Sequence, residues 1–126
     1  MRWSFDADRP IYIQLKERVK TMIAAGEYPP GERLPTVREL AEAAAVNPNT
    51  VQRAFSELER DGLIITQRTS GRIVTEDEQM TKGLRHELAD AEITRFLDRM
   101  REIGVEREEA VRFILEKKEE APHGDS

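Results

Sequence analysis

Four neighbouring positions carry side chains that hydrogen-bond nucleic acids: Asn49, Thr50, Gln52 and Arg53. Amides and hydroxyls match the donors and acceptors on base edges, and a guanidinium binds phosphate oxygens. Apolar residues recur behind this polar group at the spacing of one buried helical face, namely Val51, Ala54, Phe55 and Leu58. The spacing predicts a helix with an apolar back and a hydrogen-bonding front, the shape that DNA-binding proteins place in the major groove.

The residues before this segment predict where the helix begins and what precedes it. Asn47 is a good N-cap, and Pro48 falls at the first helical position, where its missing N–H costs nothing. Upstream, Thr36 and Glu39 have the spacing of a capping box, which starts an earlier helix. Residues 45–47 then form a three-residue turn, so the pattern predicts a helix-turn-helix. An ordinary helical hairpin in an all-α domain would show the same pattern.

A β-hairpin is predicted directly after the second helix. Residues 63–66 and 72–75 are rich in β-branched residues and flank a polar, basic tip at 67–71. A hairpin in this place is a wing. Arg68 and Arg72 are expected to contact phosphates or enter the minor groove, although solvated surface arginines would look the same.

An earlier helix completes the predicted core. It starts near Pro10, with Asp8 or Arg9 at its cap, and Gly26 ends it. Its apolar stripe consists of Ile11, Leu15, Val19, Met22 and Ile23. The sequence predicts a turn at residues 28–31 and a brief strand at residues 32–34. The predicted fold class is mainly α with a small β hairpin (α+β): a winged helix-turn-helix over residues 1–75.

Composition narrows the class of protein. The 126 residues include no cysteine, no apolar run of the ~20 residues that span a bilayer, and no signal-peptide core, so a cytoplasmic protein without membrane contact is expected. Residues 1–75 hold 11 Lys and Arg against 10 Asp and Glu, a charge of +1, and residues 76–126 hold 9 against 15, a charge of −6. An acidic tail is compatible with DNA binding if it faces away from the phosphates. The near-neutral first part also suits a second hypothesis, a winged helix that binds protein instead of DNA.

Several stretches of the chain resemble the GntR family of bacterial transcription regulators. They are PIYIQL at 10–15, YPPGERLPTVRELA at 28–41, VNPNTVQRAF at 46–55 and LERDGLI at 58–64. The resemblance covers about two thirds of the chain, with the motifs in the family's order. It implies a dimeric winged-helix repressor without a cofactor, whose partner is double-stranded DNA with a short pseudo-palindromic operator.

The resemblance also implies which residues touch DNA. Arg38 matches an arginine of the family that reaches DNA, and the start of the second helix carries the reading positions. The expected DNA-binding residues are Arg33, Thr36, Arg38, Asn47, Asn49, Thr50, Gln52, Arg53, Arg68, Ser70, Gly71 and Arg72. Thr69 stands where the wing of the family usually has its first glycine, so a close approach of the wing to the minor groove is less free.

Residues 76–120 predict two amphipathic helices separated by Gly104, and residues 121–126 predict a disordered tail. We expect the helices to pair with a second copy, which would set two reading helices about one DNA turn (~34 Å) apart. The alternative is packing within the chain. The expected dimer contacts are Leu84, Leu88, Ile93, Phe96, Leu97, Met100, Ile103, Val111, Ile114 and Leu115. Two helices after the wing resemble the YtrA-like branch, which leaves any small-molecule or stress signal unidentified.

Catalytic chemistry is not indicated. His86 and His123 are the two histidines, and neither is paired with a nucleophile or with a second ligand at metal-binding spacing. The sequence therefore predicts a protein that is not an enzyme and that holds no metal.

Overall fold

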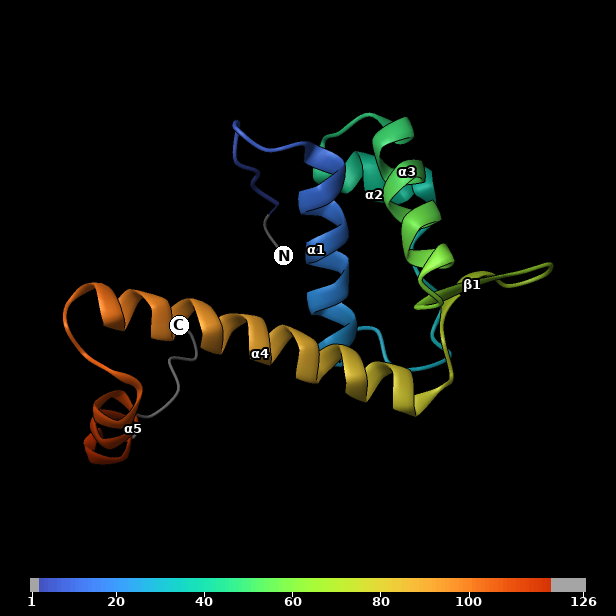
Figure 1. Ribbon diagram of the computed structural model, residues 1–126. Coiled ribbons are helices and arrows are strands. Elements are labelled where there is room, and N and C mark those ends of the chain that lie inside the picture. The colour runs from blue at the N-terminus through green and yellow to red at the C-terminus, as the bar shows by residue number, and fades with distance from the viewer. Residues whose placement is uncertain (1–2, 119–126) are drawn as a thin grey trace. The chain divides into compact units, whose positions relative to one another are not determined.

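The computed structural model describes residues 3–118 (Figure 1). The chain divides into two compact units, Met1–Leu88 and Ala89–Ser126. The described residues form five helices and one hairpin. In chain order these are α1 (Ile11–Ala24), α2 (Val37–Ala44), α3 (Pro48–Arg60), β1 (Ile64–Gln67), β2 (Gly71–Val74), α4 (Glu78–Glu102) and α5 (Arg107–Glu116). The predicted fold class, mainly α with a small β hairpin, is confirmed.

The core of the first unit forms around α3. Phe55 and Leu58 on this helix are fully buried, and α1 and α2 both pack against it. The predicted apolar stripe of α1 faces inward, with Leu15 and Val19 at its centre. Burying a side chain of this size contributes about 1.5–3 kcal/mol. The apolar spacing of α1 and α3 therefore determines which face each helix presents to solvent.

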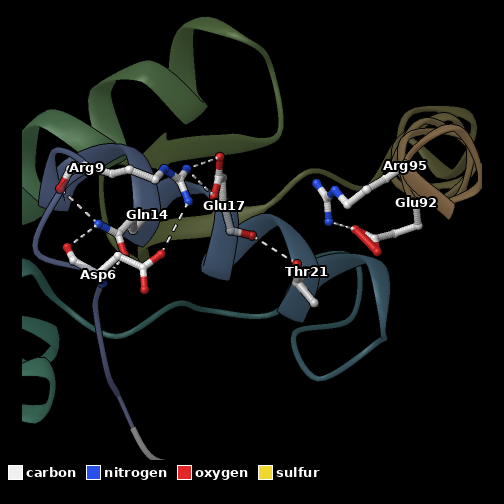
Figure 2. A network of polar contacts seen from close by, with 7 residues as sticks. All are labelled: Asp6, Arg9, Gln14, Glu17, Thr21, Glu92 and Arg95. Carbon is white, nitrogen blue, oxygen red and sulfur yellow. Dashed lines mark hydrogen bonds and ion pairs between the residues drawn. The ribbon is translucent and has the colours of Figure 1, made fainter. Parts of the chain in front are cut away.

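The start of α1 differs from the expected one. Pro10 occupies the N-cap position and makes no side-chain cap, because a proline ring offers no acceptor for the first amides. Gln14 joins the helix to the preceding loop instead: it accepts from the Asp6 N–H at 2.7 Å and donates to the Asp6 and Arg9 carbonyls at 2.9 Å (Figure 2). Arg9 donates to both carboxylate oxygens of Glu17, which fixes the loop on the next turn of α1.

The strands of the hairpin have the predicted length, but each is shifted by one residue toward the turn. Its register pairs Ile64 with Val74 and Gln67 with Gly71, so the turn contains residues 68–70 only. Gly71 has a φ of 77°, and Ala45 is the only non-glycine residue with positive φ between residues 3 and 118. Thr69 therefore occupies the turn with an ordinary backbone conformation. The brief strand expected at 32–34 appears as an isolated bridge between Arg33 and Ile73.

The beginning of α4 belongs to the first unit. Leu84 is buried in the core cluster, and Met80 and Leu88 pack against it. Leu84 does not serve the expected dimer contact, because its side chain is buried within its own chain. Leu88 packs against the same core but is only half-buried. The compact first unit ends at Leu88 and so includes the start of α4.

The second unit contains the rest of α4 and α5. Gly104, with a φ of 84°, ends α4 as predicted, and the Val105 N–H donates to the Met100 carbonyl at 2.9 Å. On α5, Ala110 is buried while most of its apolar neighbours are exposed. The tail predicted to be disordered, residues 121–126, lies outside the described residues.

The turn between α2 and α3 yields a stability prediction. Ala45 adopts φ 58° and ψ 48°, a left-handed conformation that is costly for a residue with a Cβ. Ala45→Gly should raise the free energy of unfolding by about 1 kcal/mol, measured as a higher urea midpoint at unchanged slope. Ala25, another exposed alanine directly after a helix, has an ordinary φ of −77° and is the matched control. Ala25→Gly should not stabilise; equal effects at both positions would contradict the backbone argument.

Candidate nucleic-acid interface

The start of α2 carries the predicted capping box. The Thr36 Oγ1 accepts from the Glu39 N–H at 3.0 Å, and the Thr36 N–H donates to the Glu39 Oε1 at 2.9 Å. That backbone hydrogen bond holds the pKa of Glu39 below its usual range. The same turn exposes Arg38. Thr36 thus fixes the helix end that presents Arg38 to solvent.

The start of α3 is fixed in a similar way. The Asn47 Oδ1 accepts from the Asn49 N–H at 2.8 Å, and Pro48 takes the first helical position. The turn closes where the Val46 N–H donates to the Ala41 carbonyl at 3.0 Å. The Asn47 oxygen is therefore used as a cap, which leaves its NH₂ group for an external partner.

The polar front of α3 reaches solvent as its spacing predicts. Asn49, Gln52 and Arg53 are exposed and Thr50 is half-buried. On the opposite face, Val51 and Phe55 have no exposed surface. The Gln52 Nε2 donates to the Ser56 Oγ at 3.3 Å, which directs this side chain along the helix. The arrangement offers amide, hydroxyl and guanidinium groups to one external surface.

Arg53 is positioned by a residue that the sequence analysis missed. Its guanidinium lies 3.7 Å from the centroid of the Tyr12 ring, and its Nη2 donates to the Tyr12 Oη at 3.0 Å. Tyr12 on α1 is 41 residues away along the chain, so no local spacing could have revealed the pair. Both side chains line a shallow hollow together with Ile11, Asn49 and Thr50. The hollow joins the first turn of α1 to the polar front of α3.

An ion-pair cluster joins the middle of α1 to the C-terminal end of α3. The Lys16 Nζ lies 3.2 Å from the Glu57 Oε1 and 3.1 Å from the Asp61 Oδ2. Burial disfavours the charged ammonium, but the hydrogen bonds to Asp61 and Glu57 outweigh it and raise the pKa of Lys16. Lys16 therefore stays charged at neutral pH and holds α1 against α3. These ion pairs do not involve the polar side chains at the start of α3, which stay exposed.

The wing exposes three of its four expected residues and half-buries the fourth. Arg68 and Ser70 are exposed in the turn, and Gly71 directly follows them. Arg72 is half-buried on β2, where its Nε lies 3.6 Å from the Glu59 Oε1. Arg33, at the foot of the wing, is exposed, and its Nε comes within 3.9 Å of the point where a Cβ on Gly71 would lie. The structure therefore groups Arg33 with Gly71 and separates Arg72 from Arg68.

The second unit exposes large apolar side chains. Leu97 and Met100 are half-buried, and the exposed residues from the expected dimer contacts are Ile93, Phe96, Ile103, Val111, Ile114 and Leu115. Phe113 is also exposed and was not among the expected contacts.

The part of the chain that the structure describes has neither a cluster of metal ligands nor a membrane-spanning helix. No group of three or more His, Cys, Asp or Glu side chains is placed to hold a metal ion. None of the described helices is both long and apolar enough to cross a membrane.

Residues 11–74 match the model of the bacterial regulatory proteins, gntR family. The HTH-type transcriptional repressor YtrA of Bacillus subtilis is 35% identical over 114 residues, which cover 85% of this chain and 83% of YtrA. A solved GntR family transcriptional regulator from Listeria monocytogenes is 35% identical, with a TM-score of 0.82, and the match covers 90% of this chain and all of that one. The structure of AraR(DBD) in complex with operator ORX1 is 26% identical, with a TM-score of 0.54, over 60% of this chain and 99% of that one.

The family match covers the helix-turn-helix and the hairpin, and the full-length relatives extend the likeness into the helices that follow. The chain belongs to the gntR family and is a YtrA-like, DNA-binding transcriptional regulator, not an enzyme.

Proposed function

We propose that this protein is a homodimeric repressor that covers a promoter by binding a pseudo-palindromic operator. The observation that carries the proposal is the exposed polar front of α3, held outward by a fully buried apolar back within the helix-turn-helix of a DNA-binding family. Two relatives support it: YtrA is named a repressor, and AraR(DBD) was solved on an operator.

In this proposal α3 enters the major groove. Asn49, Thr50 and Gln52 read base edges, because their amides and hydroxyl are exposed or half-buried at the start of the helix. Arg38 and Arg53 bind phosphates on either side. Arg53 is prepared for this role by Tyr12, since the stacked ring restricts the guanidinium before DNA arrives.

The remaining contacts surround this centre. Arg33 at the foot of the wing binds phosphate, and the exposed turn at Arg68 and Ser70 approaches the minor groove, with Gly71 allowing close backbone approach. Thr36 and Asn47 contribute mainly as caps, and their free hydroxyl hydrogen and NH₂ group face the DNA backbone. These assignments divide the surface into a reading centre and a phosphate-binding rim.

Dimerisation is proposed through the second unit. A second copy covers the apolar side chains that this unit exposes, of which Ile103 is 74% and Ile114 54% exposed. Removing such side chains from water drives association. A two-fold dimer presents two copies of α3 to one face of a duplex, about one turn (~34 Å) apart, which is what a pseudo-palindrome requires.

The division between reading and anchoring predicts different outcomes for two variants. Gln52→Ala should change sequence preference, losing roughly 1–3 kcal/mol on the operator but little on unrelated DNA. Arg38→Ala should weaken binding on every sequence and lower the slope of log K against log salt by about 0.9. Fluorescence anisotropy titrations at several salt concentrations measure both. Equal losses on all sequences for both variants would refute the division. Wild-type protein that fails to bind its own promoter at any salt concentration would favour the protein-binding alternative.

The Tyr12–Arg53 pair predicts a smaller effect. Tyr12→Phe keeps the ring under the guanidinium but removes the hydroxyl that accepts from the Arg53 Nη2. Operator affinity should fall about fivefold, the equivalent of one hydrogen bond of roughly 1 kcal/mol, without loss of thermal stability. Tyr12→Leu, which removes ring and hydroxyl, should lose more. Unchanged affinity for both variants would show that Arg53 needs no support from α1.

The dimer interface can be tested with a matched pair of exposed isoleucines. Ile114→Glu places a charge on the proposed contact, whereas Ile65→Glu places one on β1 of the first unit, where 43% of the side chain is exposed. Sedimentation equilibrium should give a dimer for wild type and Ile65→Glu and a monomer for Ile114→Glu, with unchanged helical circular dichroism. A wild-type monomer, or a dimer unaffected by Ile114→Glu, would contradict this interface.

A further inference from the structure

Glu59 on α3 contacts a side chain from each of the two strands of the wing. The Thr66 Oγ1 on β1 donates to its Oε2, and the Nε of Arg72 on β2 lies 3.6 Å from its Oε1. Thr66 and Arg72 are direct cross-strand partners in the hairpin register. One carboxylate of α3 therefore contacts one side chain from each strand at a single level of the hairpin.

Arg72 is packed as a structural residue. Its side chain is only 23% exposed, and its guanidinium carbon lies 5.4 Å from the centroid of the fully buried Phe55 ring. Its Nε is buried and has no hydrogen-bond partner among the described residues, so the nearby Glu59 oxygen supplies its electrostatic compensation. Moving Arg72 out to a phosphate would break the contact with Phe55 and leave Glu59 without its cation.

A hairpin as short as this one needs an external support. Each strand has four residues, and an isolated two-stranded hairpin is marginal in water. On one side β2 pairs with the segment at Arg33 and Leu34, where the Leu34 N–H donates to the Arg72 carbonyl at 2.8 Å. Glu59 supplies a side-chain attachment from α3 itself.

We infer that Glu59 is a positioning residue that fixes the wing on α3, and that Arg72 serves this attachment and does not bind phosphate. The inference rests on the proposed function in one respect, because a fixed wing matters for recognition only if the wing meets DNA. It divides the two wing arginines: Arg68 in the exposed turn makes the DNA contact, and Arg72 sets where that turn lies relative to the reading face.

The attachment is tested first without DNA, on the full chain. Thr66→Val removes one partner of Glu59 without changing net charge or β-propensity, and Glu59→Gln weakens both contacts. Hydrogen–deuterium exchange of the hairpin amides should accelerate roughly tenfold or more, the effect of losing one charge-assisted hydrogen bond, while the α1 and α3 amides stay protected. Thr69→Val in the exposed turn is the matched control and should change nothing. Hairpin exchange that is unchanged in both test variants would overturn the inference.

The second test is the salt dependence of operator binding. Arg68→Ala should lower the slope by about 0.9, the signature of one lost phosphate contact, and adding Arg72→Met, which keeps the packing on Phe55, to that variant should lower the slope no further. In the Thr66→Val background Arg68→Ala should lose less affinity than in wild type, because the wing is no longer placed. A further decrease of about 0.9 in the double variant would overturn the assignment of Arg72. Absence of operator binding by wild type would refute the proposed function, and the exchange experiment would still decide the attachment.

Discussion

The burial of the apolar back of α3 is the constraint on which the recognition surface depends. This helix packs against α1 and α2, and it completely buries Val51, Phe55 and Leu58. Any rotation of α3 about its axis would expose these side chains to solvent. The hydrogen-bonding side chains at Asn49 and Gln52 must then point outward, because a helix offers them no other direction. The core of this small unit and its reading face are two sides of one helix.

Local polar contacts refine what the core determines. The caps at Thr36 and Asn47 fix where the two short helices begin, and Lys16 ties α1 to the C-terminal half of α3. Two further contacts position arginine side chains. Tyr12 holds Arg53, which stays exposed, and Glu59 pairs with Arg72, which is half-buried. Arginines that look alike in the sequence therefore differ in what they can bind.

The sequence predicted the features that local chemistry encodes. Helix periodicity, the capping box and the turn at 45–47 depend on residues a few positions apart, and all three were found in the structure. The missed features join distant residues: Tyr12 with Arg53, Arg72 with Phe55, and Leu84 with the core of the first unit. The amphipathic pattern at the start of α4 predicts that one face of the helix is buried. It does not predict whether the same chain or a second copy covers that face. For this reason the apolar spacing alone predicts a dimer contact for Leu84, which its own chain buries.

The charge distribution explains why such a surface should act in pairs. Residues 1–75 carry a charge of only +1, so general attraction to phosphates is weak compared with that of a strongly basic domain. Binding must then depend on a few well-placed cations and on base contacts that are worth roughly 1–3 kcal/mol each. In the proposed dimer both sets are doubled, while the −6 charge of residues 76–126 opposes any binding mode that brings the second unit to the phosphates. Weak general attraction and acidic flanking helices favour one orientation on DNA, and this makes accurate placement of Arg38, Arg53 and the wing more important than the number of positive charges.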